Sequence, residues 1–143
     1  MEITTFLIAD HAEAVKGKLY VTGGGWDVLT FSKLPARRAH VSLAVVLRVP
    51  WHETDMKHDL TVDLVDADNG SLLRKGAVGG SFSAGRPPHA RVGDDQPGLF
   101  VMNFDNVEFT EPGDYRFLLS VDDAPLADAR FKVVAREEPQ EES

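Results

Sequence analysis

The sequence contains no cysteine among its 143 residues. This absence excludes disulfide bonds, thiolate-ligated zinc, iron–sulfur clusters and a thiol nucleophile. Long apolar runs are also missing, and the short run over residues 6–9 has no basic segment in front of it. We therefore expect neither a signal peptide nor a membrane-spanning segment, and hence a cytoplasmic protein.

Positive charge is scarce, with 15 Lys and Arg against 23 Asp and Glu and a net charge of −8. Half of that net charge lies in an acidic tail over residues 137–143, which we predict to be disordered. The basic residues are scattered among acids without interleaved aromatic residues. Nucleic acid is therefore not an expected partner, because binding to phosphates needs clustered Lys and Arg.

Short runs rich in Val, Leu, Phe and Thr alternate with Gly, Pro, Asn and Asp. This spacing predicts about nine or ten short strands in a single domain over residues 1–136, with at most a short helical turn. The expected fold is an all-β, mainly antiparallel sandwich, immunoglobulin-like or C2-like.

Individual segments give further expectations. Residues 40–49 are apolar on both faces over part of their length, which is typical of a central strand. Residues 10–17 form a connection in this interpretation, and Asn69-Gly70 predicts a hairpin turn whose return strand is Ser71 to Lys75. Side-chain parity changes near Asp105-Asn106, where we expect a β-bulge. Residues 83–98 hold three prolines and predict a long loop.

No motif predicts catalysis or a cofactor. His52 and His58 are six residues apart, whereas the zinc-protease helix needs histidines four apart. Gly23-Gly24-Gly25 is not followed by the Lys-Ser or Lys-Thr of a phosphate-binding loop. No Gly-x-Ser-x-Gly elbow is present. We therefore assign no catalytic residue, no cofactor and no metal ligand from motifs.

A weaker possibility concerns the aspartates expected at strand ends. The segment from Asp66 begins like a calcium-binding loop, but Ser71 and Ala77 occupy the positions of the required Gly and Glu. Loops that meet at one rim of a sandwich could still pool carboxylates for calcium. The members of that set are Asp10, Asp66, Asp68, Asp122 and Asp123. The alternative is that aspartate is simply common in turns.

Trp26 and Trp51 lie next to strand ends. Each could anchor a partner, because aromatic side chains dominate interface hot spots. More often, such residues close one end of the core, with the indole N–H bonded to a loop carbonyl, and we favour this interpretation.

The stretch Phe6 to Leu29 resembles the opening of a family of small uncharacterised bacterial proteins. The similarity is carried by Ala9-Asp10, by Gly17-Lys18-Leu19-Tyr20 and by Gly23-Gly24-Gly25-Trp26. The segments 49–53 and 65–70 look like the same family, and residues 111–134 are similar to the last strands of immunoglobulin-like modules. The resemblance implies a mostly-β, cytosolic bacterial protein and transfers no functional residue.

The leading hypothesis is a non-enzymatic binding or assembly module that engages an unknown protein partner or a second copy of itself. Exposed strand edges, which can recruit another chain, motivate this hypothesis. One alternative is calcium-dependent binding through the five aspartates. The other is a hydrolase with its site beside the 83–98 loop.

Overall fold

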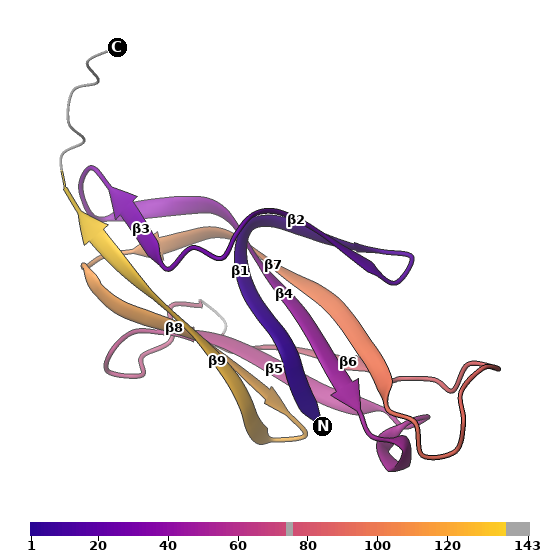
Figure 1. The fold of residues 1–143 in the computed structure, drawn as a ribbon. Coiled ribbons are helices and arrows are strands. Elements are labelled where there is room, and N and C mark those ends of the chain that lie inside the picture. The colour runs from indigo at the N-terminus through magenta and orange to yellow at the C-terminus, as the bar shows by residue number, and fades with distance from the viewer. Residues whose placement is uncertain (74–75, 137–143) are drawn as a thin grey trace.

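Residues 1–73 and 76–136 are described by a computed structural model in which two β-sheets pack face to face (Figure 1). Over this part of the chain there are nine strands and one short 3-10 turn: β1 (Glu2–Val15), β2 (Lys18–Gly24), β3 (Val28–Phe31), β4 (Ala36–Val49), η1 (Trp51–Glu53), β5 (His58–Val65), β6 (Val78–Phe82), β7 (Gln96–Phe109), β8 (Gly113–Val121) and β9 (Ala124–Ala135). The predicted all-β sandwich is confirmed. None of the described residues belongs to a helix long and apolar enough to cross a membrane.

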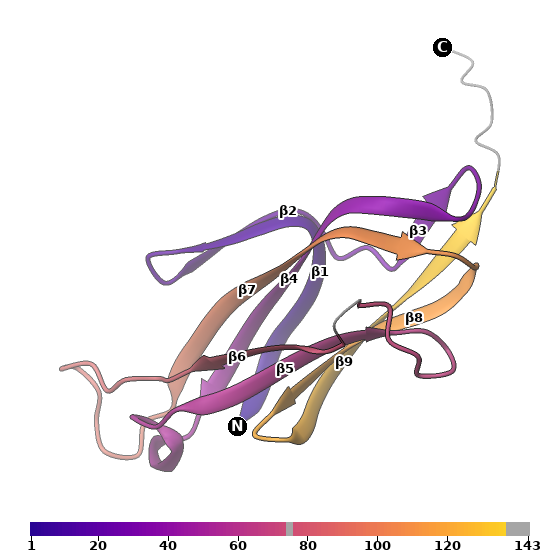
Figure 2. The same ribbon diagram turned by 180° about the vertical axis from the view of Figure 1, so that it is seen from behind.

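The first sheet has the order β2-β1-β4-β7 and the second has the order β3-β9-β8-β5-β6 (Figure 2). Every neighbouring pair is antiparallel except β3 and β9, which run parallel. The order leaves β2 and β7 at the edges of the first sheet and β3 and β6 at the edges of the second.

Strand β4 is the central element that the sequence predicts. Val41, Leu43 and Val45 point between the sheets and belong to the buried core, where they meet the aromatic side chains of the second sheet. Phe131 stacks on Phe117 at a centroid distance of 5.7 Å. Complete burial of side chains of this size contributes about 1.5–3 kcal/mol each, so the core supplies the main stabilisation.

The hairpin of β1 and β2 corrects one expectation and matters for the site. Residues 10–15, predicted as a connection, continue strand β1, and the ladder runs from Ala9↔Gly24 to Val15↔Lys18. Lys16 and Gly17 close the hairpin with positive φ angles. The distal part of this hairpin, residues 10–24, is called the arm here, and its strands contact β7 as well as the rest of the first sheet.

The turn after β5 corrects a second expectation. Asn69 has a φ of 64°, as the predicted turn requires, but Gly70, the other central residue of that turn, does not have a positive φ, and Ser71 forms only an isolated bridge with Val65. Residues 71–73 therefore form no return strand, and Arg74 and Lys75 lie outside the described residues. The physical reason is that the Asp66 carboxylate accepts the backbone N–H groups of Asp68 and Gly70, which closes the turn locally.

A third expectation, a β-bulge near Asp105-Asn106, is wrong. Asn106 adopts a φ of 54°, while β4 and β7 keep the same register on both sides of it. The change of parity therefore comes from one left-handed residue, and Phe104 and Val107 both enter the core. Asparagine tolerates this backbone conformation better than most residues.

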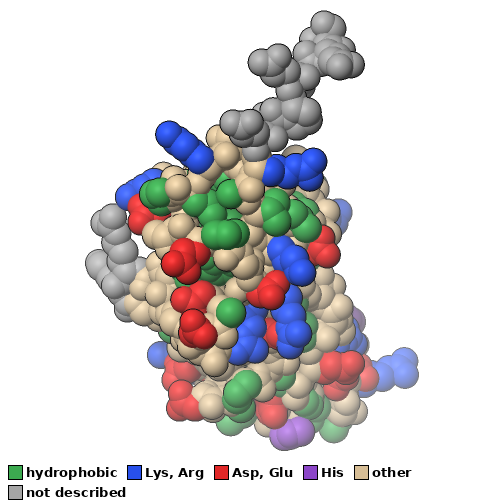
Figure 3. All heavy atoms as spheres, turned by 90° about the vertical axis from the view of Figure 1, so that its left-hand side faces the viewer, with side chains coloured by type: hydrophobic (Ala, Val, Ile, Leu, Met, Phe, Trp, Pro, Cys, Tyr) green, Lys and Arg blue, Asp and Glu red, His purple; other side chains and the backbone are tan. Residues whose placement is uncertain are grey.

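The outer face of the second sheet carries charges of both signs (Figure 3). Arg130 lies 3.2 Å from Asp128, and Lys132 lies 3.9 Å from Asp114. Exposed pairs of this kind contribute about 0–1 kcal/mol each, so they affect solubility more than stability.

A buried histidine joins three segments at the end of the sandwich near the N-terminus. His58 is 4% exposed, its Nδ1 donates to Asp122 at 2.7 Å and its Nε2 donates to the Glu53 carbonyl at 2.7 Å. Both nitrogens donate only when the imidazole is protonated. Burial alone lowers the pKa of His58, whereas its hydrogen bonds to Asp122 and Glu53 and the negative charges of these two residues raise it. The net effect is a pKa above 6.5.

The partner carboxylate shifts in the complementary direction. The hydrogen bonds from His58 and from the Asp59 backbone hold the pKa of Asp122 below its ordinary value of 3.8. A raised histidine pKa stabilises the fold below pH 6.5 and loses its effect as pH rises through the folded pKa. A lowered carboxylate pKa stabilises above pH 3.8 and loses its effect as pH falls through the folded pKa.

We therefore expect the pair to stabilise the protein most between about pH 4 and pH 6.5. The substitution Asp122→Asn should flatten the fall in unfolding free energy above pH 6.5, measured by denaturant titration at several pH values. His58→Ala should lower the unfolding free energy by about 2–4 kcal/mol, because it removes a buried side chain with its hydrogen bonds.

Asp123→Asn is the matched control, since Asp123 is exposed in the same turn. It should leave the pH profile of stability unchanged. If Asp122→Asn and Asp123→Asn give the same profile as the wild type, the pair does not carry this pH dependence.

Candidate functional site

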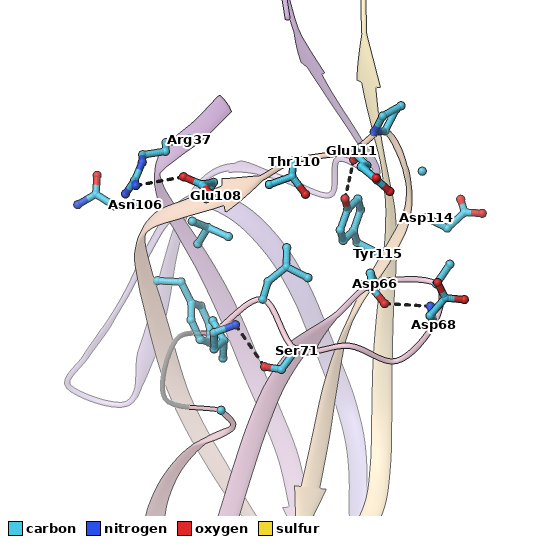
Figure 4. A pocket seen from close by; sticks show the side chains of 18 of the residues that line it. Arg37, Asp66, Asp68, Ser71, Asn106, Glu108, Thr110, Glu111, Asp114 and Tyr115 are labelled. Atoms are coloured by element: carbon cyan, nitrogen blue, oxygen red, sulfur yellow. Dashed lines mark hydrogen bonds and ion pairs between the residues drawn. The ribbon is translucent and has the colours of Figure 1, made fainter. Parts of the chain in front are cut away.

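A groove of about 840 Å³ lies at one side of the sandwich (Figure 4). One wall is formed by the connection from β5 to β6, including Asp66, Ser71 and Leu72. The opposite wall is formed by residues 103–108 of β7 and by the turn into β8. The groove is thus placed where the edges of the two sheets diverge.

The described residues that line the groove include many carboxylates. Its carboxylates come from both walls: Asp66, Asp68, Asp105, Glu108, Glu111 and Asp114. Arg37 is the one cationic side chain among the described lining residues, and it pairs with Glu108 at 3.1 Å. Tyr115 lies at the base, where its hydroxyl donates to the Glu111 carbonyl at 2.5 Å. Burial and the nearby charges of Asp66 and Glu111 raise the pKa of Tyr115, so it stays protonated at neutral pH.

Strand β6 leads to this groove, and no other strand of the described residues pairs with its outer edge. Four of its five residues, 78–81, are exposed, and its sequence Val-Gly-Gly-Ser-Phe has no charge and no proline. Proteins usually protect an edge with charges, prolines or bulges. Phe82 packs on Phe100 at 5.7 Å and closes one end, whereas Val78 lines the groove at the other.

A histidine cluster lies on the outer face of the first sheet, next to the groove. The His11 Nδ1 and His40 Nε2 atoms are 3.1 Å apart. The His11 Nε2 atom contacts Glu13 at 2.9 Å, and the His40 Nδ1 atom contacts Asp105 at 2.6 Å. Asp105 therefore belongs both to the cluster and to the wall of the groove.

We did not identify this cluster from the sequence, although a signal was present. Polar residues stand two apart on three strands, as His11 and Glu13, His40 and Ser42, and Asn103 and Asp105. Residues two apart on a strand share a face. The pairings His40↔Asp105 and Ser42↔Asn103 then bring the strands together, and only the register supplies that information.

The side chains of Ser42, His40 and Asp105 contact one another in the sequence Ser-His-Asp, as in the catalytic triad of a serine hydrolase. The Ser42 Oγ atom is 3.2 Å from His40 Nε2, on the opposite side of the ring from Asp105. Ser42, however, is 0% exposed and donates its hydroxyl proton to the Asn103 Oδ1 atom at 2.6 Å. A substrate carbonyl cannot reach a fully buried oxygen, so this arrangement does not act as a nucleophile.

The five aspartates proposed for calcium do not gather at one rim. Asp66 and Asp68 follow the C-terminal end of β5. Asp122 and Asp123 lie near the opposite, N-terminal end of β5, where the Asp122 carboxylate accepts the Asp59 N–H. Asp10 lies in the first sheet and accepts hydrogen bonds from Trp26 and Arg38. Within residues 1–73 and 76–136, no three or more His, Asp or Glu side chains converge as a preformed metal cage.

The two tryptophans occupy different environments. The Trp26 Nε1 atom donates to Asp10 at 3.0 Å, and its ring meets the edge of Phe131 at a centroid distance of 5.8 Å. Trp51 lies in η1, with the Arg86 guanidinium over its ring at 3.8 Å. Both indoles are half-buried and contact groups of this chain.

The segment 83–98 is shorter as a loop than the sequence indicates, because β7 begins at Gln96. Arg86 attaches its first part to η1 by donating to the Thr54 hydroxyl at 2.6 Å and to the Trp51 carbonyl at 2.9 Å. Neither the acidic groove nor the second cavity, of about 570 Å³ along β8 and β9, is lined by this loop.

Comparisons with known proteins add a family without an activity. A family model described as a family of unknown function, DUF6941, matches residues 4–134. No curated protein matches the chain. Among solved structures, the chain is similar to the Pseudomonas fluorescens alkylpurine DNA glycosylase AlkC bound to DNA containing an abasic site analog. That similarity has 13% identity and a TM-score of 0.44, and it covers 90% of this chain and 30% of the glycosylase chain.

The contacts of Arg86 generate a prediction about the 83–95 loop. Arg86→Ala should increase amide hydrogen exchange and protease cleavage in this loop several-fold, because it removes the stacking on Trp51 and two hydrogen bonds. Hydrogen exchange followed by mass spectrometry measures this change.

Arg91→Ala is the control from the same loop, since only the backbone N–H of Arg91 bonds to Asp94. Equal exchange in the two variants would show that Arg86 does not hold the loop.

Proposed function

Because the chain belongs to DUF6941, a family of unknown function, no activity comes with its membership, and we propose that it is a non-enzymatic protein-binding module. Its partner contributes an extended segment rich in Lys or Arg. This segment pairs with the edge of β6 and continues past Val78 into the acidic groove. The observation that carries the proposal is an unprotected strand edge that leads directly into a carboxylate-lined cavity.

The edge of β6 supports strand addition. In a sheet each strand offers backbone N–H and C=O groups on both sides, and β5 uses only one side of β6. Gly79 and Gly80 carry no side chain that could hinder an incoming strand. An incoming strand can therefore approach closely and satisfy these groups.

The groove supports the charge of the partner. Its carboxylates attract cations, and the net charge of −8 adds a favourable long-range field. Alternating Lys or Arg side chains of an extended segment all point to one face, so they can meet several of these carboxylates together. The same field opposes docking of a second, equally acidic copy into the groove.

The surface also favours protein over nucleic acid as the partner. On the face shown in Figure 3, Lys and Arg side chains are interspersed with Asp and Glu. Phosphate binding needs a basic patch or stripe, and the groove itself has the opposite sign.

The proposal is tested with a fluorescein-labelled peptide of alternating Lys and Thr, eight residues long, and an acidic peptide in which Glu replaces Lys. The basic peptide should bind, and its affinity should fall with added salt, whereas the acidic peptide should not bind. The variant Asp68→Asn/Glu111→Gln/Asp114→Asn should weaken binding about tenfold, because three screened ion pairs are lost. Fluorescence anisotropy measures the affinity.

A second variant of equal charge, Glu2→Gln/Asp95→Asn/Asp123→Asn, alters carboxylates outside the groove and should bind as the wild type does. Hydrogen exchange should show new protection in residues 79–82 when the peptide is bound. Equal weakening in both triple variants, or no protection of β6, would contradict the proposed binding mode.

Assembly through the arm is the second candidate function. Val15 and Tyr20 are exposed on one face of the arm and Val21 on the opposite face, with Tyr20 at 56%, so apolar side chains lie on both faces beside its edge. Its strand β2 is also an edge strand with one unpaired side. Two copies could join edge to edge along β2, which would bury these side chains.

Size-exclusion chromatography with light scattering tests this second candidate. The wild type should form a concentration-dependent dimer, and Tyr20→Ser/Val21→Thr should remain monomeric. Val92→Ser, which removes an exposed valine outside the arm, should dimerise like the wild type. A strictly monomeric wild type up to millimolar concentration would remove this candidate.

A further inference from the structure

We propose that His11 and His40 form a binding site for a divalent transition-metal ion of the zinc type. The two residues come from different strands, β1 and β4, and meet on the outer face of the first sheet. Their facing nitrogens, Nδ1 of His11 and Nε2 of His40, are 3.1 Å apart, and the ring centroids are 5.2 Å apart. The site shares Asp105 with the wall of the groove, but its two histidines do not line the groove, and metal binding by them does not require the proposed peptide binding.

Each imidazole is held from behind by a carboxylate. Glu13 contacts the outer nitrogen of His11 at 2.9 Å, and Asp105 contacts the outer nitrogen of His40 at 2.6 Å. A carboxylate accepts hydrogen bonds only, so each outer nitrogen carries the proton. Histidines that bind metals commonly have such a carboxylate behind them, because it orients the ring and makes the inner nitrogen more basic.

This arrangement leaves the two inner nitrogens facing one another. If both imidazoles are neutral, two lone pairs meet across 3.1 Å, which is unfavourable unless a proton or a cation lies between them. Two nitrogens bound to one zinc ion at about 2.0–2.1 Å lie about 2.8–3.4 Å apart for angles between about 90° and 110°. The observed separation of 3.1 Å falls in this range, so one ion can contact both nitrogens.

The exposure of the pair leaves room for further ligands. The His11 side chain is 47% exposed and the His40 side chain is 33% exposed. No third His, Asp or Glu of the described residues completes a cage, so water or a donor from a partner fills the remaining positions. Imidazole ligands favour Zn²⁺, Ni²⁺ and Cu²⁺, whereas Ca²⁺ and Mg²⁺ favour oxygen ligands.

The other described histidines lack these features. His58 uses both ring nitrogens in hydrogen bonds to its own chain. His52 is a strongly exposed residue of η1 that approaches Glu53 at 3.7 Å, and His89 is an exposed residue of the 83–95 loop. His52 therefore provides a matched control for a metal effect that depends on a single surface imidazole.

Isothermal titration calorimetry with ZnCl₂ on the tag-free protein tests the proposal. The wild type should bind one Zn²⁺ ion per chain, with a rise in melting temperature that EDTA reverses, and millimolar Ca²⁺ or Mg²⁺ should not compete. His11→Ala and His40→Ala should each weaken binding at least tenfold, whereas His52→Ala should bind as the wild type does.

Two further variants separate a built site from a surface histidine. Glu13→Gln and Asp105→Asn keep both metal ligands and should weaken Zn²⁺ binding about tenfold or more, because the rings lose their orientation. Glu13→Gln and His11→Ala alter exposed residues of the arm, so their folding in EDTA can be compared directly by circular dichroism. Absence of heat at millimolar ZnCl₂, or equal binding by wild type and His11→Ala, would overturn the proposal and indicate that the pair only shares a proton.

Discussion

The antiparallel register between β4 and β7 organises both faces of the first sheet. The pairing runs from Ala36↔Phe109 to Val49↔Gln96 without a shift. Because side chains alternate along a strand, the same pairing directs Val41 and Phe104 into the core and His40 and Asp105 to the outside. A slip of one residue would exchange the two faces, so core stability and the geometry of the histidine cluster depend on one register.

The groove results from a second constraint, the divergence of the two sheets at one side. The contact between Phe82 and Phe100 keeps the edges of β6 and β7 together at one end. Toward the other end of these two strands, no such aromatic pair joins their described residues. There the connection after β5 and the turn into β8 form walls rich in carboxylates. Loops exposed to water tolerate such charge, and the core is not disturbed because the buried Phe104 and Tyr115 close the base.

Where the backbone ladders end, side chains hold the connections in place. His58 joins η1 to the turn between β8 and β9, and Arg86 joins the 83–95 loop to Trp51 and Thr54. The His58 ring and the Arg86 guanidinium each form two directed hydrogen bonds, and such bonds are stronger when one partner is charged. The turn between β8 and β9 and the 83–95 loop are thus held in defined positions at the same end of the sandwich.

The sequence alone determined the all-β sandwich, the central strand 40–49 and most strand positions, because period-two alternation and turn residues are local signals. It did not predict that residues 10–15 remain in a strand or that Asp66 closes its own turn, since both depend on competition between local hydrogen bonds. The cluster of His11, His40 and Asp105 required the pairing of three strands, and separations of up to 65 residues leave no trace in spacing. Only the tertiary structure decided which carboxylates share the groove, because side chains from distant loops meet there through packing.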